Sequence, residues 1–218
     1  MKFEKLGLID DVVPKVASEN MAIDEALFLT AETPVLRIYR WLFPSVSFGY
    51  FTPWNDVVRR FHGRDLIRRW TGGGIVEHGN DLTYSVVCPS GLQIPRTMEF
   101  YQLIHAAIAT VLRGAGYTVE LAQSGELTDS NACFEKTVLY DLKFGDAKIA
   151  GAAVRRNRKG LLLQGSIQRL QLPSGFGDMF GRALCDRPES FPLPESTLRF
   201  ARSLATQKYG AAEWNRRG

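Results

Sequence analysis

The sequence predicts an α+β fold in which one mixed β-sheet is flanked by helices. The middle of the chain is rich in strand-like segments, the helical patterns stand on either side of it, and the regular strand–helix alternation of parallel α/β folds is missing. The chain has 218 residues, of which 45% are hydrophobic, so it suits one domain with a full core. We therefore expect a single domain over residues 1–218, closed by helices over about residues 195–217.

The first half of the chain alternates helical and strand-like patterns. The clearest helix covers Thr97–Gly114, because its apolar residues recur on one face, and Gly114-Ala115-Gly116 ends it as a C-cap. The other expected elements are a helix over Glu19–Ala31 capped by Ser18, a strand over Val35–Trp41, a partner strand over Val46–Phe51 across the turn Phe43-Pro44-Ser45, a helix that starts at Thr52-Pro53, and strands over Asp65–Trp70 and Ile75–Cys88 around a glycine turn.

The second half is expected to supply most of the remaining sheet. Good turn residues, Gly145-Asp146 and Asn157-Arg158-Lys159-Gly160, separate three of its strand candidates. The expected elements are strands over Tyr117–Leu121, Thr137–Phe144, Lys148–Arg156 and Leu161–Leu170, a polar loop over Gln123–Asn131, a surface connector over Pro188–Pro194, and helices over Ser196–Tyr209 and Ala211–Arg216.

Composition excludes several classes of protein. No apolar run approaches the roughly 18 residues that a membrane-spanning helix needs, and the acidic residues Asp10 and Asp11 come too early for a signal peptide. Cys88, Cys133 and Cys185 are few, odd in number and without metal-ligand spacing, which favours a reducing cytoplasm and no metal site. We expect no membrane partner.

Basic residues gather at one predicted hairpin. Arg155, Arg156, Arg158 and Lys159 lie close together in a chain whose net charge is +4. Aromatic residues are not interleaved with these charges, as a nucleic-acid stacking surface would require, so we expect no nucleic-acid partner. A solvated hairpin tip and a docking patch for an acidic protein both fit the pattern.

The most informative stretch is Arg68-Arg69-Trp70-Thr71-Gly72-Gly73-Gly74-Ile75-Val76-Glu77-His78. Glycines allow a ligand to approach the backbone N–H groups closely, and guanidinium groups suit phosphate and carboxylate oxygens. The spacing is neither that of a Walker phosphate loop nor that of a dinucleotide-binding loop. It favours a site for an anionic, acyl-bearing ligand, although a plain hairpin turn with solvated arginines has the same pattern.

Four motifs together resemble the family of lipoate–protein ligases and lipoyl-carrier octanoyltransferases. They are the opening helix Glu19–Leu27, the segment from Arg68 to Gly74 followed by His78 and Asp81–Ser85, the lysine motif Asp146–Ala153, and the strand Leu163–Ile167. The C-terminal Tyr209-Gly210 and Trp214-Asn215 also resemble the family's ending. The resemblance thus spans most of the chain in the right order.

The resemblance implies the biotin/lipoate ligase-like fold, related to class II synthetases, and a lipoylation task. A member would attach octanoate or lipoate to one lysine of an acidic lipoyl carrier domain or of a glycine cleavage H-type protein. The positions of this chain that match the family's binding motifs are Arg68, Arg69, Thr71, Gly72, Gly73, Gly74, His78, Asp81, Gly151 and Ala152. His78 is a candidate polar wall or proton carrier, or else a structural histidine. Asp81 is a candidate to organise the glycine loop through backbone N–H groups, or else a cap or turn residue.

Two routes to the amide product exist in this family. A transferase takes the octanoyl group from acyl carrier protein through a cysteine thioester and needs no cofactor; Cys133, ahead of the lysine motif, matches that cysteine, and Lys148 would stabilise the developing charge. A ligase activates free lipoate with ATP and Mg²⁺, and Gly74 resembles the ligases. We favour the transferase and keep the ligase as the alternative. A non-catalytic binder of lipoyl carriers is a third possibility, because Ala152, Val154 and Gln164 depart from the family's usual residues.

Overall fold

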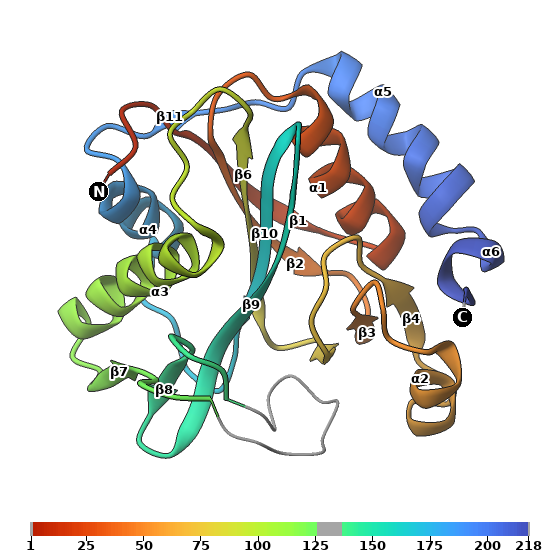
Figure 1. Cartoon of the computed structure of the whole chain (residues 1–218), viewed down its shortest axis with the longest axis horizontal. Helices are drawn as coiled ribbons and strands as arrows, with labels where there is room; N and C mark the ends of the chain where they lie inside the picture. The colour runs from red at the N-terminus through yellow and green to blue at the C-terminus, as the bar shows by residue number, and fades with distance from the viewer. Residues whose placement is uncertain (1, 126–136, 218) are drawn as a thin grey trace.

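The computed structural model describes residues 2–125 and 137–217, and it confirms the α+β architecture with a mixed sheet between helices. Figure 1 shows the larger sheet in the middle of the molecule, with helices on both sides of it. Its strands, in spatial order, are β11 (Glu189–Ser190), β1 (Gly7–Lys15), β2 (Val35–Trp41), β6 (Leu82–Pro89), β10 (Gly160–Ile167), β9 (Ala147–Asn157), β8 (Leu142–Phe144) and β7 (Val119–Leu121). Strands β11, β1 and β2 run parallel, and the other neighbouring pairs are antiparallel.

Each face of this sheet carries its own core because side chains alternate along a strand. On β2, Leu36 and Ile38 pack with α3 (Thr97–Gly114) and α4 (Phe176–Leu184). Val35 and Tyr39, on the other face, pack with α1 (Ala17–Thr30). The layers are therefore helix, sheet and helix.

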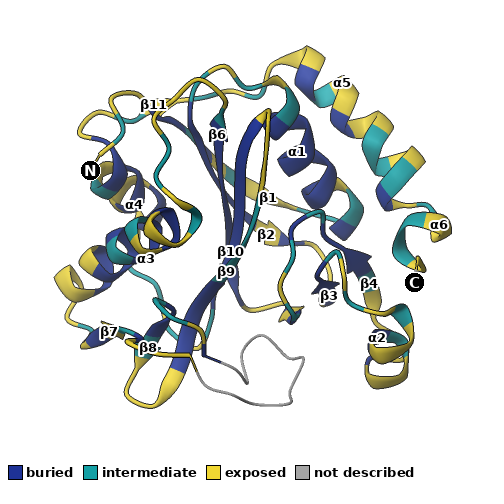
Figure 2. Cartoon of the chain, viewed as in Figure 1, coloured by how far each residue is buried: buried dark blue, intermediate teal, exposed yellow. Residues whose placement is uncertain are grey.

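Helix α1 is buried over most of its surface, as Figure 2 shows, because it is covered on both sides. The sheet lies beneath it, and α5 (Glu195–Leu204), a π-helical turn over Ala205–Tyr209 and α6 (Ala212–Asn215) follow one another over its outer side and beside β4. Among residues 2–125 and 137–217, no helix has the length and apolar character that crossing a bilayer would require.

A second, three-stranded sheet holds the glycine-rich stretch. Its order is β4 (Asp65–Arg68), β3 (Ser45–Phe48) and β5 (Ile75–His78), and α2 (Trp54–Arg60) covers it through a small apolar cluster. The chain leaves β5 through a short turn and enters β6 of the larger sheet. The end of β5 and the start of β6 both supply polar side chains to the site described below.

Several sequence expectations are confirmed closely. The strand Val35–Trp41 and the helix Thr97–Gly114 have the expected limits, and the hairpin of β9 and β10 matches its two expected strands within a few residues. The expected strands over Thr137–Phe144 and Tyr117–Leu121 are shortened to β8 and β7.

Two strand expectations were wrong. The segment Ile75–Cys88 is not one strand but two, because the Gly79 N–H donates to Asp81 Oδ1 at 3.1 Å and closes a turn between the sheets. The segment after Pro44 does not pair with β2, since β1 and β6 already occupy both edges of β2. It pairs instead with β4 and β5.

Three elements were missed, namely β1, α4 and the two-residue strand β11, which lies inside the expected connector Pro188–Pro194. Two helix starts also differ from expectation. Strand β1 is interrupted by a register shift between Asp11 and Lys15, which breaks its alternation, and α4 starts after the left-handed Gly175 and contains two more glycines. Helix α1 begins after Val16 with no side-chain cap, and Pro53 precedes α2 as its N-cap residue.

Candidate active site

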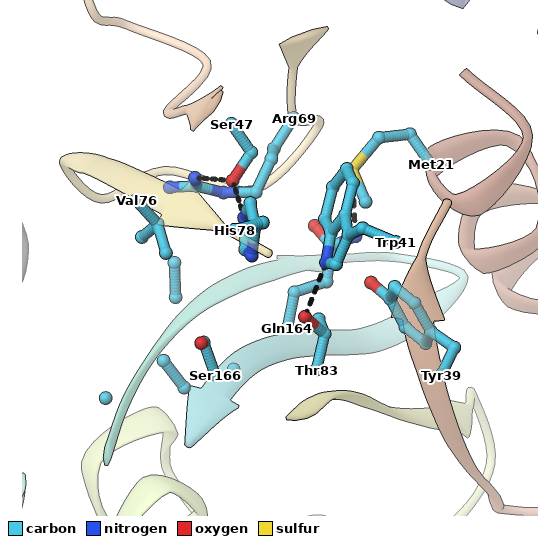
Figure 3. Close-up of a pocket in the computed structure, with 14 residues that line it drawn as sticks. Met21, Tyr39, Trp41, Ser47, Arg69, Val76, His78, Thr83, Gln164 and Ser166 are labelled. Atoms are coloured by element: carbon cyan, nitrogen blue, oxygen red, sulfur yellow. Dashed lines mark hydrogen bonds between the residues drawn. The ribbon is translucent and has the colours of Figure 1, made fainter. Parts of the chain in front are cut away.

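A narrow pocket lies where α1, the larger sheet and the three-stranded sheet meet. Its empty space is about 360 Å³, including the open mouth, and its walls are mostly apolar (Figure 3). The lining residues that matter below are Trp41, Ser47, Arg69, His78, Gln164 and Ser166. Gly151, Ala152 and Ala153 of β9 form a wall of small side chains. The shape suits a slender, apolar chain with a polar end.

The glycine loop after β4 is held in a fixed conformation. Gly73 has φ +83°, in the left-handed region, and a Cβ there would lie 3.0 Å from Ala153 Cβ. Arg69 braces the loop, because its Nη2 donates to the carbonyls of Gly72 and Gly74 at 3.1 and 2.8 Å. Within the described residues, the N–H groups of Gly72, Gly73 and Gly74 donate no hydrogen bond. These groups are available to an anionic ligand.

A line of polar groups runs along one pocket wall. Arg69 Nη1 donates to Ser47 Oγ at 2.7 Å, and Ser47 Oγ lies 2.6 Å from His78 Nε2. His78 Nδ1 lies 2.7 Å from Asp81 Oδ2. The His78 ring stacks on Trp41 with centroids 3.9 Å apart, which fixes its plane.

Asp81 is the buried acceptor at the end of this line. Besides His78, its Oδ2 accepts hydrogen bonds from Thr83 and Ser166 at 2.9 and 2.7 Å. Burial alone would raise the pKa of Asp81, but the charge and hydrogen bonds of its partners outweigh burial and lower that pKa to about 2. Asp81 is therefore an ionised carboxylate at neutral pH. Of the two roles expected for Asp81, the turn role fits its bond to the Gly79 N–H, whereas among the described residues no N–H of the loop Gly72–Gly74 donates to it.

Lys148 lies against the wall of small residues. Its ammonium pairs with Asp141 at 2.7 Å, and both side chains are almost fully buried. A Cβ at position 151 would come within 2.6 Å of Lys148 Cε, so Gly151 makes room for this side chain. Tyr101 of α3 donates to Asp141 Oδ1 and accepts from the Ala152 N–H at 3.0 Å. Lys148 is thus held beside Gly151, a residue of the pocket wall, by a partner set that sequence reasoning missed.

A buried polar network closes the far end of the pocket. Asp24 of α1 accepts hydrogen bonds from Arg37, Tyr39, Ser85 and Gln164, each at 2.8 or 2.9 Å. Gln164 in turn accepts from Thr71 Oγ1 at 2.8 Å, so the network reaches the glycine loop. Thr71 is buried and acts here as a link between β10 and the loop. Asp24 lies inside a recognised motif, and its acidic side chain beside Glu25 in an otherwise apolar stretch was the signal that could have found it.

Arg68 is not brought to the pocket. Its guanidinium donates to the backbone carbonyls of Tyr50 and Thr52, both at 2.8 Å, and to those of Trp214, Asn215 and Arg217 at 3.2, 3.1 and 2.5 Å. These bonds engage all of its N–H groups. The side chain ties the loop after β3 to the C-terminal segment.

Cys133 lies outside the described residues. The described chain stops at Gly125 and resumes at Thr137, and a Cβ on Gly125 would lie 3.6 Å from the Thr137 carbonyl oxygen, so the two ends are close. Thr137 is four residues before Asp141, the partner of Lys148. The other two cysteines, Cys88 and Cys185, are buried, and burial raises the pKa of Cys88 to about 12.

The basic residues at the β9–β10 hairpin divide into two kinds. Arg155 folds back, with its guanidinium 4.1 Å from the Trp70 ring centroid and Nη1 donating to the Trp70 carbonyl at 3.1 Å. Arg156 is exposed and donates to the carbonyls of Pro95 and Ile94 at 2.6 and 3.3 Å. Arg158 and Lys159 are exposed at the turn.

Comparisons with known proteins place these residues in a family context. The family described as lipoyl protein ligase A/B catalytic domain matches residues 17–180. An octanoyltransferase LipM of Carboxydothermus hydrogenoformans is 36% identical over 163 residues, which cover 69% of this chain and 60% of that protein. The chain thus spans about three fifths of that relative. An octanoyltransferase LipM of Symbiobacterium thermophilum is 31% identical, with 91% of this chain and 94% of that protein covered.

A solved structure has the same fold over nearly the whole chain. It is a lipoate-protein ligase A bound with ATP, which superposes with a TM-score of 0.70 at 26% identity and covers 99% of each chain. The chain is thus similar in sequence to proteins named octanoyltransferases and in fold to a ligase bound with ATP.

Proposed function

Because the chain belongs to the lipoyl protein ligase A/B catalytic-domain family, we propose that it transfers an octanoyl or lipoyl group to one lysine of a lipoyl carrier domain. The observation that carries the proposal is the narrow apolar pocket. Its wall residue Arg69 bonds to the glycine loop, and its wall residue Gly151 adjoins the buried Lys148. An acyl tail fills such a pocket, and its carbonyl end meets the polar groups. We take residues 1–218 as one catalytic domain that acts in the cytoplasm.

The favoured donor is octanoyl-acyl carrier protein, and Cys133 is the proposed acyl acceptor. The Cys133 thiolate attacks the donor's thioester carbon, a carbon–sulfur bond forms, and the carrier's thiol leaves as the old bond breaks. A lysine amine of the lipoyl domain then attacks the Cys133 thioester, loses a proton and forms the amide, which releases the Cys133 thiol. Exchange between two thioesters needs no ATP.

Lys148 contributes positive charge where the carbonyl oxygen becomes negative. An ammonium held by Asp141 need not reorganise as the charge develops, so it stabilises the transition state more than a mobile lysine does. The N–H groups of the glycine loop, which donate to no group among residues 2–125 and 137–217, supply further donors. His78, Asp81 and Arg69 set the wall against which the acyl chain lies.

The partners proposed are acidic proteins. A lipoyl domain or a glycine cleavage H-type protein is the acceptor, and acyl carrier protein is the donor. The exposed Arg156, Arg158 and Lys159 at the β9–β10 turn support this, because a positive patch steers an acidic carrier toward the molecule.

A second candidate is ATP-dependent ligation of free lipoate. Its support is the row of unpaired N–H groups at Gly72, Gly73 and Gly74, which suits a phosphate, together with the ATP bound by the similar ligase. In that case ATP and Mg²⁺ are the cofactors, and Lys148 neutralises an adenylate phosphate. A non-catalytic carrier-binding module is the third reading.

Intact mass after exposure to each donor separates these candidates. The protein incubated with octanoyl-acyl carrier protein gains one octanoyl group on Cys133, and it passes that group to an added lipoyl domain. Cys133→Ala gains none, whereas Cys185→Ala, which removes a buried cysteine, behaves as the parent. A lipoyl adenylate formed from lipoate and ATP would favour the ligase instead. Tight carrier binding with no adduct and no turnover from any donor would leave only the binding module.

A further inference from the structure

Ser47, His78 and Asp81 form a serine–histidine–aspartate chain in the pocket wall. They come from β3, β5 and the turn after β5, and Figure 3 shows Ser47 between Arg69 and His78. The two hydrogen-bond distances, Ser47 Oγ to His78 Nε2 and His78 Nδ1 to Asp81 Oδ2, are 2.6 and 2.7 Å. The proposed transfer through Cys133 uses none of these groups as a nucleophile.

The hydrogen atoms in this chain can be assigned from the partners. The Asp81 carboxylate can only accept, so His78 Nδ1 carries a hydrogen. In the neutral imidazole, Nε2 then has a free lone pair and accepts from the Ser47 hydroxyl. Arg69 can only donate, so its hydrogen bond uses a lone pair of Ser47 Oγ. This is the polarity that a histidine needs to take a proton from serine.

The surroundings hold this arrangement in place and bury it. Ser47 is 1% exposed and His78 7% exposed, yet both line the pocket. Trp41 stacks on the imidazole and its Nε1 is itself held by Thr83 at 2.7 Å. Thr83 also donates to Asp81. Thr83 therefore holds both the Trp41 ring that stacks on His78 and the Asp81 carboxylate that orients His78.

We propose that Ser47 is a second acyl acceptor in this pocket, with His78 as its base and Asp81 as the orienting carboxylate, so that the chain hydrolyses medium-chain acyl esters and thioesters. The inference rests on the proposed acyl pocket, and it is independent of Cys133. The substrate class follows from the apolar lining and the narrow shape.

The chemistry balances without a cofactor. Ser47 Oγ attacks the acyl carbon, its proton passes to His78 Nε2, and the tetrahedral oxygen becomes negative. The bond to the leaving thiol or alcohol breaks, and that group takes the proton from His78. Water then attacks the Ser47 ester by the same path and releases the free fatty acid. Arg69, a fixed cation 2.7 Å from Ser47 Oγ, is close enough to offset the charge on the tetrahedral oxygen.

The test uses the full chain carrying Cys133→Ala, with p-nitrophenyl octanoate and S-octanoyl-N-acetylcysteamine as probes. We expect cleavage of both probes and an octanoyl adduct on the peptide that contains Ser47. Ser47→Ala and His78→Asn in the same background lower cleavage on the order of 100-fold. Ser45→Ala is the matched control, because Ser45 lies two residues away on β3 and bonds to Phe43 and Asp65 outside the pocket.

A further variant excludes a merely structural effect of Ser47. In Ser47→Cys the adduct becomes a thioester, which neutral hydroxylamine removes, whereas the serine ester resists neutral hydroxylamine and yields only to alkaline hydroxylamine. Cleavage unchanged by Ser47→Ala, or an adduct on another residue, overturns the proposal. If Cys133 of the parent chain is not acylated, the proposed transfer route is wrong. That result does not affect the proposal of ester cleavage by Ser47, which is tested separately.

Discussion

Lys148 and Asp141 form an ion pair with 2.7 Å between Nζ and Oδ2, and 3% and 0% of their side chains are exposed. Asp141 also accepts from Tyr101 and from the Val138 N–H at 2.7 Å. Burial raises the pKa of Asp141, and the positive charge of Lys148 opposes that effect. The position of the proposed catalytic ammonium is therefore set by Asp141. This residue lies four positions after Thr137, where the described chain resumes.

Replacing Asp141 by Asn should destabilise the fold and slow acyl transfer. The buried ammonium loses this counter-charge, and breaking a buried pair from one side costs about 3 kcal/mol. Urea unfolding and transfer kinetics at pH 7 measure the two effects. Because removing both charges is cheaper than removing one, the double variant Asp141→Asn with Lys148→Met should recover stability without recovering transfer. Equal stability of the single and double variants would contradict the account.

Replacing Gly73 by Ala should reduce transfer beyond its effect on stability. The residue is left-handed at φ +83°, and the new Cβ would press on Ala153 and, at 3.3 Å, on Arg69 Nη2. The backbone strain alone costs about 1 kcal/mol. Gly91→Ala is the control, because Gly91 has φ +94° but open space around a Cβ. By thermal unfolding, Gly91→Ala should lose only the strain energy and Gly73→Ala more, because of its steric contacts, while only Gly73→Ala loses kcat/KM, by roughly tenfold.

The sequence could predict the parts of the site that local pattern determines. The glycine turn, the hairpin carrying Lys148 and the helix Thr97–Gly114 have periodicities or turn residues of their own. The outcome for Arg68 and Arg69 shows the limit of such reasoning. The two are adjacent and alike in type, yet one saturates carbonyls of the C-terminal segment and the other braces the pocket loop.

Contacts between distant segments decide the rest, and no local pattern encodes them. Asp141 forms an ion pair with Lys148 where β8 pairs with β9, and that pairing contains a register shift between Leu142 and Lys143. The sequence carries no local sign of this shift. Ser47 lies beside His78 because β3 pairs with β5 in the second sheet. The alternation of residues had predicted a hairpin between β3 and β2 instead. His105 stands inside the helical pattern of Thr97–Gly114, and only the packing of α3 shows that it is buried and bonded to Tyr84.

Replacing Arg68 by Lys should destabilise the C-terminal segment without raising KM for an acyl donor. Lysine has fewer donors and no planar fork, so several buried carbonyls lose their partner, at about 3 kcal/mol in total. Urea unfolding and the rate of proteolysis near Trp214 measure this. Arg59→Lys, at an exposed position of α2, should be neutral. A raised KM at unchanged stability would instead restore Arg68 as a substrate-binding residue.

Reversing charge at the β9–β10 turn should slow carrier association. Of the basic residues at this turn, Arg156 is the cleaner one to reverse, as Arg156→Glu, because Arg155 packs on Trp70. The on-rate for an acidic lipoyl domain should fall roughly two- to fivefold at low salt and recover as salt screens the charges. Arg59→Glu, which makes the same charge change on α2, controls for net charge. Equal on-rates for Arg156→Glu and the parent at low salt would contradict the proposal that this turn docks an acidic carrier.

His105 should make stability depend on pH between about 6.5 and 3. It is fully buried, its Nδ1 donates to the Tyr140 carbonyl, and its Nε2 accepts from Tyr84, both at 2.9 Å. Burial lowers the pKa of His105 to about 3, so in this window the unfolded chain binds a proton that the folded chain refuses. Stability from this group is full above pH 6.5 and falls by about 1.4 kcal/mol per pH unit below it. We would measure the free energy of unfolding in urea at pH 7, 6 and 5. It should fall less steeply with decreasing pH in His105→Asn than in the parent, even if the two proteins differ in stability at pH 7. His62→Asn, at an exposed position, should keep the parent's slope. Parallel profiles for the parent and His105→Asn would mean that the folded chain protonates His105 as readily as the unfolded one.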